Sequence, residues 1–129
     1  MIYQTIYQKL YTLLPNLDKI EQYAKLKTKG LMDLSVDVLR REEDKIIIAL
    51  SHYYEQNGDL VPNPDITIAI YPEMKMAEAL TYQDTYVYQQ VYPKQGHVYP
   101  KLKQDLNRFL NNWLSTLLQG DYQIAPTPA

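Results

Sequence analysis

Apolar residues near the start of the chain recur with the spacing of an α-helix. The pattern runs from Ile2 to Leu14, and Pro15 ends this first helix because its ring disfavours helical backbone in the residue before it. A weaker apolar stripe predicts a second helix, which Asn16 can cap and which ends at Gly30. The sequence therefore predicts two N-terminal helices.

The last part of the chain carries the clearest helical pattern. Between Lys101 and Gln119 the apolar residues form one wide stripe, and the opposite, polar face includes Asn107. Gly120 follows the last turn, where a glycine commonly ends a helix. We expect this helix to cover one face of a sheet and residues 121–129 to form a flexible tail.

Between the helices the hydrophobic period changes to two, which is typical of a β-strand with one buried face. The connections are short and rich in charged or turn-forming residues, and they favour an antiparallel meander over parallel crossovers. The predicted fold class is α+β: a four-to-five-stranded antiparallel meander sheet packed by a long C-terminal helix and two N-terminal helices, in a single domain over residues 1–120. The expected strands are 32–38, 46–54, 66–70 and 76–82, with a further extended segment at 86–92.

The composition is that of an ordinary globular domain. The chain has 129 residues, of which 46% are hydrophobic and 22% charged, and it contains no cysteine. Disulfides, thiolate catalysis and cysteine-ligated zinc are therefore excluded. A net charge of −2 lacks the basic excess of a duplex nucleic-acid binder. The N-terminus does not resemble a signal peptide and no apolar run is long enough to span a membrane, so we expect a cytoplasmic protein.

Tyrosine is the unusual feature of the composition, with 13 Tyr against one Phe and one Trp. Its apolar ring and polar hydroxyl suit half-buried sheet faces as well as exposed contact surfaces. The tyrosines between Tyr82 and Tyr99 could stack nucleic-acid bases, but proteins that bind single strands pair such rings with a basic groove. Here the cations close by are Lys94, Lys101 and Lys103.

One candidate catalytic arrangement involves His52, the histidine of a predicted strand. Strand alternation places His52 and Tyr54 on one face, and Glu78 of a neighbouring strand could orient the imidazole as a general base. A nucleophile is missing, because Ser51 falls on the opposite face. The alternative is a structural histidine that is bonded to a neighbouring tyrosine or to the backbone.

Oxygen-bearing side chains after His52 partly resemble a calcium loop. Glu55, Asn57, Asp59 and Asp65 surround a glycine, but the glycine comes too early for an EF-hand and the closing glutamate is absent. Asn and Asp are also the residues that tight turns select. His97 has no second histidine at ligand spacing. We therefore expect no metal and no other cofactor.

Several stretches together resemble a known family. They are HYYEQNGDL at 52–60, PDI at 64–66, MAEA at 76–79, YP at 92–93 and NRFLNNWL at 107–114. This pattern is similar to the YqiB-like proteins, an uncharacterised bacterial family of unknown function, over about residues 31–118. The matching residues are mostly core and turn positions, so the resemblance implies a shared fold rather than a shared activity.

Three functional hypotheses follow from the sequence. The first is a non-catalytic binding or regulatory module that presents its tyrosine-rich sheet edge and the loop Glu55–Asp65 to a protein partner or a second copy. The second is a small enzyme or ligand-binding domain with a pocket around His52, Tyr54 and Glu78. The third is single-stranded nucleic-acid binding. We expect the first, with no membrane and no duplex nucleic acid among its partners.

Overall fold

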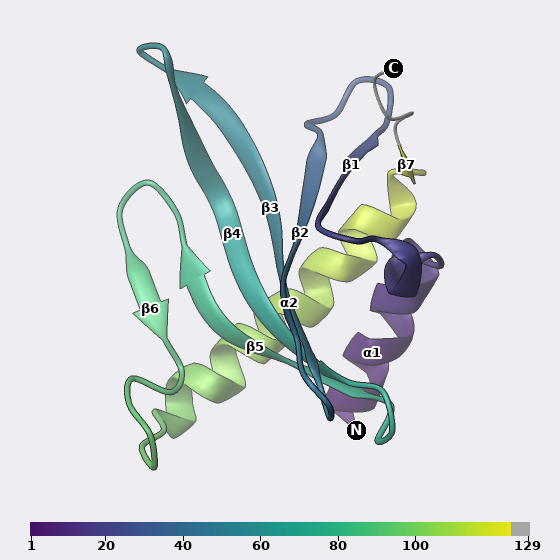
Figure 1. Ribbon diagram of the computed structural model, residues 1–129. Coiled ribbons are helices and arrows are strands. Elements are labelled where there is room, and N and C mark those ends of the chain that lie inside the picture. The colour runs from purple at the N-terminus through teal and green to yellow at the C-terminus, as the bar shows by residue number, and fades with distance from the viewer. Residues whose placement is uncertain (125–129) are drawn as a thin grey trace.

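A computed structural model of the chain describes residues 1–124, apart from the side chain of Glu55. A first helix begins this part of the chain and a second lies near its C-terminal end; strands lie between the two helices, and one short strand follows the second helix (Figure 1). The elements are α1 (Ile2–Leu13), the 3₁₀ helix η1 (Leu17–Lys19), β1 (Tyr23–Lys27), β2 (Leu34–Arg41), β3 (Ile46–Gln56), β4 (Asp59–Tyr71), β5 (Met76–Gln83), β6 (Tyr88–Gln90), α2 (Pro100–Gln119) and β7 (Gln123–Ile124).

The described strands form one antiparallel seven-stranded sheet in the order β6-β5-β4-β3-β2-β1-β7. Its centre is the long β3–β4 hairpin, whose tip projects away from the helices (Figure 1). Asn57 and Gly58 connect these strands with φ of 54° and 86°. Positive φ at both central residues is what a two-residue hairpin turn requires, and an Asn-Gly pair adopts it readily.

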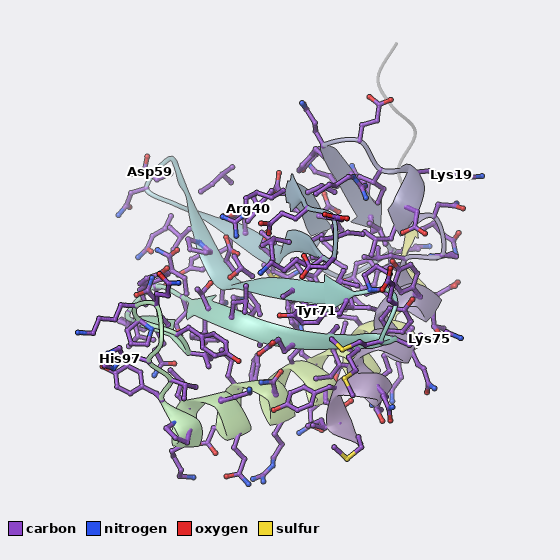
Figure 2. The ribbon with its side chains drawn as sticks, turned by 60° about the horizontal axis from the view of Figure 1, so that its bottom comes forward. Lys19, Arg40, Asp59, Tyr71, Lys75 and His97 are labelled. Carbon is purple, nitrogen blue, oxygen red and sulfur yellow. The ribbon has the colours of Figure 1, made fainter. Side chains whose placement is uncertain are left out.

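Both helices pack on the same face of the sheet, as Figure 2 shows from below. The strands meet them with every second residue, because successive side chains of a strand point to opposite faces. These residues and the apolar stripes of the helices form one core, whose fully buried members include Ile6, Leu10, Leu34, Ile48, Leu50, Ile66, Ile68, Leu110 and Leu114.

The other face of the sheet has no helix over it among residues 1–124, and we call it the open face. Small residues that point to it are nevertheless buried, with exposed fractions of 6% for Ala49, 0% for Ser51 and 1% for Ala69. Larger side chains on the same strands, Tyr53 and Tyr71, are partly buried and are held by hydrogen bonds to Asp65 and Glu78. The centre of the open face therefore consists of small buried residues, with tyrosines on the same strands.

The α+β class, the antiparallel sheet and the long C-terminal helix are confirmed, but the prediction of two N-terminal helices is wrong. Where the second helix was expected, the chain forms only the single turn η1 and then strand β1. In β1 the side chains alternate, and Leu26 is buried opposite Leu34 of β2. The weak apolar stripe of the predicted helix was too sparse to hold a helix against the core, whereas β1 pairs with β2 over four residues.

The predicted number of four to five strands is also wrong. Strands β1 and β7 extend the sheet at one edge, and β7 pairs with β1 from within the predicted tail, of which residues 125–129 lie outside the described part. Strand β4 also starts earlier than expected, at Asp59, and runs through Pro62 and Pro64. Proline has no backbone N–H to donate to a neighbouring strand. The register of β3 and β4 shifts opposite these prolines, so regular pairing is interrupted where the N–H groups are missing. The single-domain boundary at residue 120 stays a prediction.

α2 is the longest described helix, and it is amphipathic rather than apolar all round. Among residues 1–124, no helix combines the length and the apolar character that crossing a bilayer would need.

Asn107 of α2 does not lie on an exposed polar face as predicted but is 1% exposed. Its Oδ1 accepts a hydrogen bond from the backbone N–H of Ala79 in β5 at 2.8 Å, and its Nδ2 donates to the backbone oxygen of Lys103 at 2.8 Å. Strand β6 pairs with β5 only from Thr81 to Gln83, so the Ala79 N–H lies on an otherwise unpaired edge. Asn107 therefore caps the edge of the sheet from within the helix.

Replacing Asn107→Ala should lower the free energy of unfolding by about 2–3 kcal/mol, because it leaves the buried N–H of Ala79 without an acceptor. Asn112→Ala, at an exposed position of the same helix, should change it by less than about 0.5 kcal/mol. Urea unfolding followed by circular dichroism measures both values. Equal losses in the two variants would contradict the role of Asn107 as an edge cap.

Candidate functional site

His52 lies on the helix side of β3, where its ring forms a hydrogen bond and packs against two aromatic rings. Its Nδ1 is 2.8 Å from the backbone oxygen of Asp33. The ring meets Trp113 of α2 edge-on, with 5.6 Å between centroids, and lies 6.3 Å from the ring of Tyr122. The hydroxyl of Tyr54, further along β3, shares a hydrogen bond with Thr85. These contacts give both side chains a packing role.

Glu78 does not join His52 and Tyr54. It lies opposite Ala69 of β4, whereas the part of β4 beside His52 is the stretch from Pro62 to Asp65. At about 3.3 Å per residue, the four residues from Asp65 to Ala69 alone separate them by about 13 Å along the strand. The catalytic arrangement suggested by the sequence is therefore not assembled.

Glu78 instead joins strand β5 to its neighbour β4, to Tyr92 after β6 and to Lys103 of helix α2. Its Oε2 accepts a hydrogen bond from the hydroxyl of Tyr71 at 2.9 Å, and its Oε1 accepts one from Tyr92 at 2.5 Å. The Nζ of Lys103 lies 3.9 Å from Oε1, between the rings of Tyr3 and Tyr92. Its hydrogen bond with Tyr92 raises the pKa of Lys103, which keeps the ammonium charged. A hollow of about 350 Å³ opens here, but the charges along it are already paired.

The residues of the proposed calcium loop are spread along the β3–β4 hairpin. Asn57 forms its turn, and Asp59 is exposed at the tip, far from Tyr71 at the other end of β4 (Figure 2). Asp65 follows six residues later, roughly 15–20 Å along the strand. The side chain of Glu55 lies outside the described part. Among the described side chains, no three acidic or histidine groups converge to hold a metal ion.

Asp65 belongs to a different group, on the open face. The sheet register places Ser35, Ser51 and Asp65 side by side on β2, β3 and β4. The next row on this face contains Asp37 of β2 and Ala49 of β3. Asp37 and Asp65 therefore lie diagonally across β3, one on each side of the small residues Ala49 and Ser51. We call Asp37, Ser51 and Asp65 the open-face carboxylate site.

The electrostatics of this site are unfavourable as it stands. Burial raises the pKa of both Asp37 and Asp65, and the charge of Asp65 raises that of Asp37 further. The hydroxyl of Tyr53 donates to Asp65 Oδ2 at 3.0 Å and offsets part of this effect. Within residues 1–124, neither carboxylate forms an ion pair. Two partly buried carboxylates thus lie diagonally across β3, and no cation among residues 1–124 pairs with either of them.

Ser51 adds a second unsatisfied group to the same site. It is 0% exposed, and in the described part of the chain its Oγ has no hydrogen-bond partner. The Tyr53 hydroxyl donates its hydrogen to Asp65, and the Ser51 hydroxyl beside it partly offsets the raised pKa of Tyr53. Sequence reasoning singled out Asp65 but missed Asp37 and Ser51, because only the pairing of β2 and β4 with β3 brings them together.

A separate exposed surface lies at the β6 edge of the sheet. The N–H of Asp84 donates to the oxygen of Val87, and the N–H of Val91 donates to the oxygen of Leu80. Because hydrogen-bonded residues alternate along an antiparallel strand, the backbone groups of Tyr88 and Gln90 point away from β5. β6 ends the sheet, so these groups have no neighbouring strand among the described residues.

The side chains of the edge segment itself are apolar or uncharged. Residues 85–92 contain no charged residue. Tyr86 is 90% exposed and Tyr88 56% exposed. A hollow of about 400 Å³ lies between this segment and α2, and its apolar lining includes Tyr82, Val87, Leu102, Leu106 and Phe109. We call the outer edge of β6 with Tyr86 and Tyr88 the β6 edge surface.

The fold and these surfaces define a helix-backed antiparallel sheet domain with one uncovered face. Residues 2–122 match the family described as Domain of unknown function (DUF6908), and the chain belongs to this family. Comparison with curated proteins and with solved structures found no match. The prediction of a family of unknown function is therefore confirmed, whereas the more specific resemblance to YqiB-like proteins stays a prediction.

The raised pKa of Asp37 predicts that removing its charge stabilises the fold at neutral pH. The folded state holds the Asp37 proton more tightly than the unfolded state, so this group's contribution to stability is lost as pH rises from the ordinary pKa near 3.9 through the folded value. Asp37→Asn should raise the midpoint of thermal unfolding at pH 7 by about 1–3 °C, a modest effect because the carboxyl is only partly buried.

At pH 3, where the carboxyl is protonated in both states, the Asn variant and the parent should unfold at the same temperature. Asp44→Asn, in the exposed turn between β2 and β3, serves as the control and should show no such pH-dependent gain. Differential scanning calorimetry at both pH values measures the difference. A variant less stable than the parent at pH 7 would show that Asp37 carries a favourable charge.

Proposed function

We propose that the chain is a non-catalytic binding module whose β6 edge surface accepts an extended segment of a protein partner. The observation that carries this proposal is an uncharged sheet edge with outward-facing backbone groups at Tyr88 and Gln90. Sheet edges are normally protected by charge, proline or a covering element, because they pair readily with other chains. An unprotected edge is suited to a partner that adds a strand.

The tyrosines of this surface would supply binding energy beyond the backbone pairing. Tyr86 and Tyr88 are largely exposed, and tyrosine is among the residues that most often dominate protein interfaces. The hollow between β6 and α2 offers an apolar site for side chains of the added strand, with Leu106 and Phe109 in its lining. Backbone pairing would set the register of the partner, and this hollow would select its side chains.

The cations near this surface favour a protein over a nucleic acid. Lys101 is paired with Asp105 at 3.1 Å, and Lys103 is held by Glu78 and two tyrosine rings. Asp84 and Asp105 also line the hollow beside β6. A single-strand binder needs a basic groove along the backbone of its ligand. We place the module in the reducing cytoplasm, since a fold without cysteine needs no disulfide.

Gln90→Lys tests the proposal, because a charge on the outer edge of β6 should hinder an incoming strand without removing any tyrosine. Peptides selected from a displayed random library on the native chain should bind this variant at least about tenfold more weakly, which is about 1.4 kcal/mol. Gln56→Lys carries the same charge change at the hairpin tip and should bind like the native chain. Fluorescence polarisation measures each affinity.

Native mass spectrometry of the same proteins separates a foreign partner from a second copy. A dimer that Gln90→Lys disrupts and Gln56→Lys preserves would replace the foreign partner with a second copy of this chain on the same edge. Selected peptides that bind both variants equally would place the binding surface elsewhere and contradict the proposal. A monomeric chain that enriches no peptide would contradict it as well.

A further inference from the structure

The open-face carboxylate site contains more hydrogen-bonding capacity than the chain uses. Asp37 and Asp65 flank Ser51, whose Oγ is fully buried and without a partner in the described part of the chain. Buried polar groups are almost always hydrogen-bonded, so such a group needs an explanation. A ligand that donates several hydrogen bonds and carries positive charge would satisfy the two carboxylates, and it would reach Ser51, which is 0% exposed, once the side chains over the serine move aside.

We propose that the open face binds a guanidinium group between Asp37 and Asp65, with Ser51 Oγ as a further hydrogen-bond partner. The guanidinium is planar and presents five N–H donors in a fixed arrangement, so it can donate to acceptors on different sides at once. Charge-assisted bonds of this kind to carboxylates are among the strongest that proteins form. This site is separate from the β6 edge surface and does not depend on the function proposed for it.

The spacing of the strands favours such a ligand over a metal ion. Asp37 and Asp65 belong to β2 and β4, which lie on opposite sides of β3. Neighbouring strands are about 4.8 Å apart and the two residues are also offset by two positions along the strands, so their backbones are separated by roughly 12 Å. A metal ion would draw its oxygen ligands to within about 2.0–2.6 Å, whereas a guanidinium bridges carboxylates that stay further apart.

Tyrosines border the site from two strands. Tyr23 of β1 pairs with Asp37, and its hydroxyl shares a hydrogen bond with Ser35 at 3.2 Å. Tyr53 of β3 is fixed by its hydrogen bond to Asp65. Aromatic rings attract guanidinium groups, which stack on their faces. The two rings, each anchored by its hydroxyl, therefore form suitable walls for this cation.

The cations of the chain on this face leave the site open. Lys25 of β1 lies opposite Ser35 and is exposed, and it forms no ion pair with Asp37 or Asp65. Arg40 of β2 lies at the far end of the face, opposite Ile47, and its nearest carboxylate is Glu42 at 3.9 Å. The cation that completes the site would therefore come from outside the chain.

Titration with N-acetyl-arginine amide, followed by ¹⁵N NMR of the full chain, tests this proposal. Amide signals of β2, β3 and β4 around Asp37, Ser51 and Asp65 should shift together and saturate. N-acetyl-citrulline amide has the same shape without the charge and should produce no saturable shift. N-acetyl-lysine amide should bind at least several-fold more weakly, since an ammonium lacks the forked donors.

Variants then assign the binding to these side chains. Asp37→Asn and Asp65→Asn keep the size of the side chain and should each weaken binding at least about tenfold, while Ser51→Ala should weaken it by a smaller factor. Asp59→Asn, at the hairpin tip, is the matched control and should bind normally. The NMR spectrum of each variant verifies that its fold is retained.

Two further ligands distinguish the sources of the guanidinium. An arginine within a short glycine peptide represents a protein side chain, and agmatine represents a free small molecule. Binding of either, lost in the Asn variants, supports the site. Equal shifts with citrulline amide, equal affinity for lysine amide, or unchanged binding in both Asn variants would overturn it, as would the absence of any saturable shift.

Discussion

Both helices of this domain pack on the same face of the sheet, and this one-sided arrangement determines how the rest of the structure is built. A two-layer fold can share one core, which here joins α1, α2 and the inward residues of the central strands. The other face has to be satisfied without a covering layer. It uses small residues in its centre and tyrosines that are bonded to carboxylates or hydroxyls around them, as in the pairs Tyr53–Asp65 and Tyr23–Ser35.

The edges of the sheet also need partners, because the outer strand exposes backbone N–H and C=O groups that no neighbouring strand pairs. Part of the β5 edge is capped by the buried Asn107, which replaces a neighbouring strand with a side-chain amide. β6 continues that edge for only three residues, and its own outer side is left uncapped among the described residues. The outer side of β6 is therefore the part of this edge whose backbone groups remain available for pairing among the described residues.

The sequence predicted those elements whose pattern is strong over many residues, namely the first and last helices and the central strands. It failed for β1 and for β7 because strands of this length have almost no pattern of their own and form by pairing with a neighbour. Asn107 was assigned to solvent because its type is polar, although its burial depends on the edge of β5. Asp65 could be named from the sequence, but its relation to Asp37 and Ser51 depends on the register of three strands.

The carboxylate of Asp37 opposes folding at neutral pH, since burial and the charge of Asp65 raise its pKa. The hydrophobic core on the helix side consists of other residues. It can therefore offset the loss of folding free energy that Asp37 causes. Polar or charged side chains that lower the stability of the free protein are typical of binding sites, because a bound ligand supplies the interactions that they lack. The same reasoning does not apply to Glu78, whose partners Tyr71, Tyr92 and Lys103 already satisfy it. Glu78 is thus a structural tie, whereas Asp37 and Asp65 have no cation among the described residues.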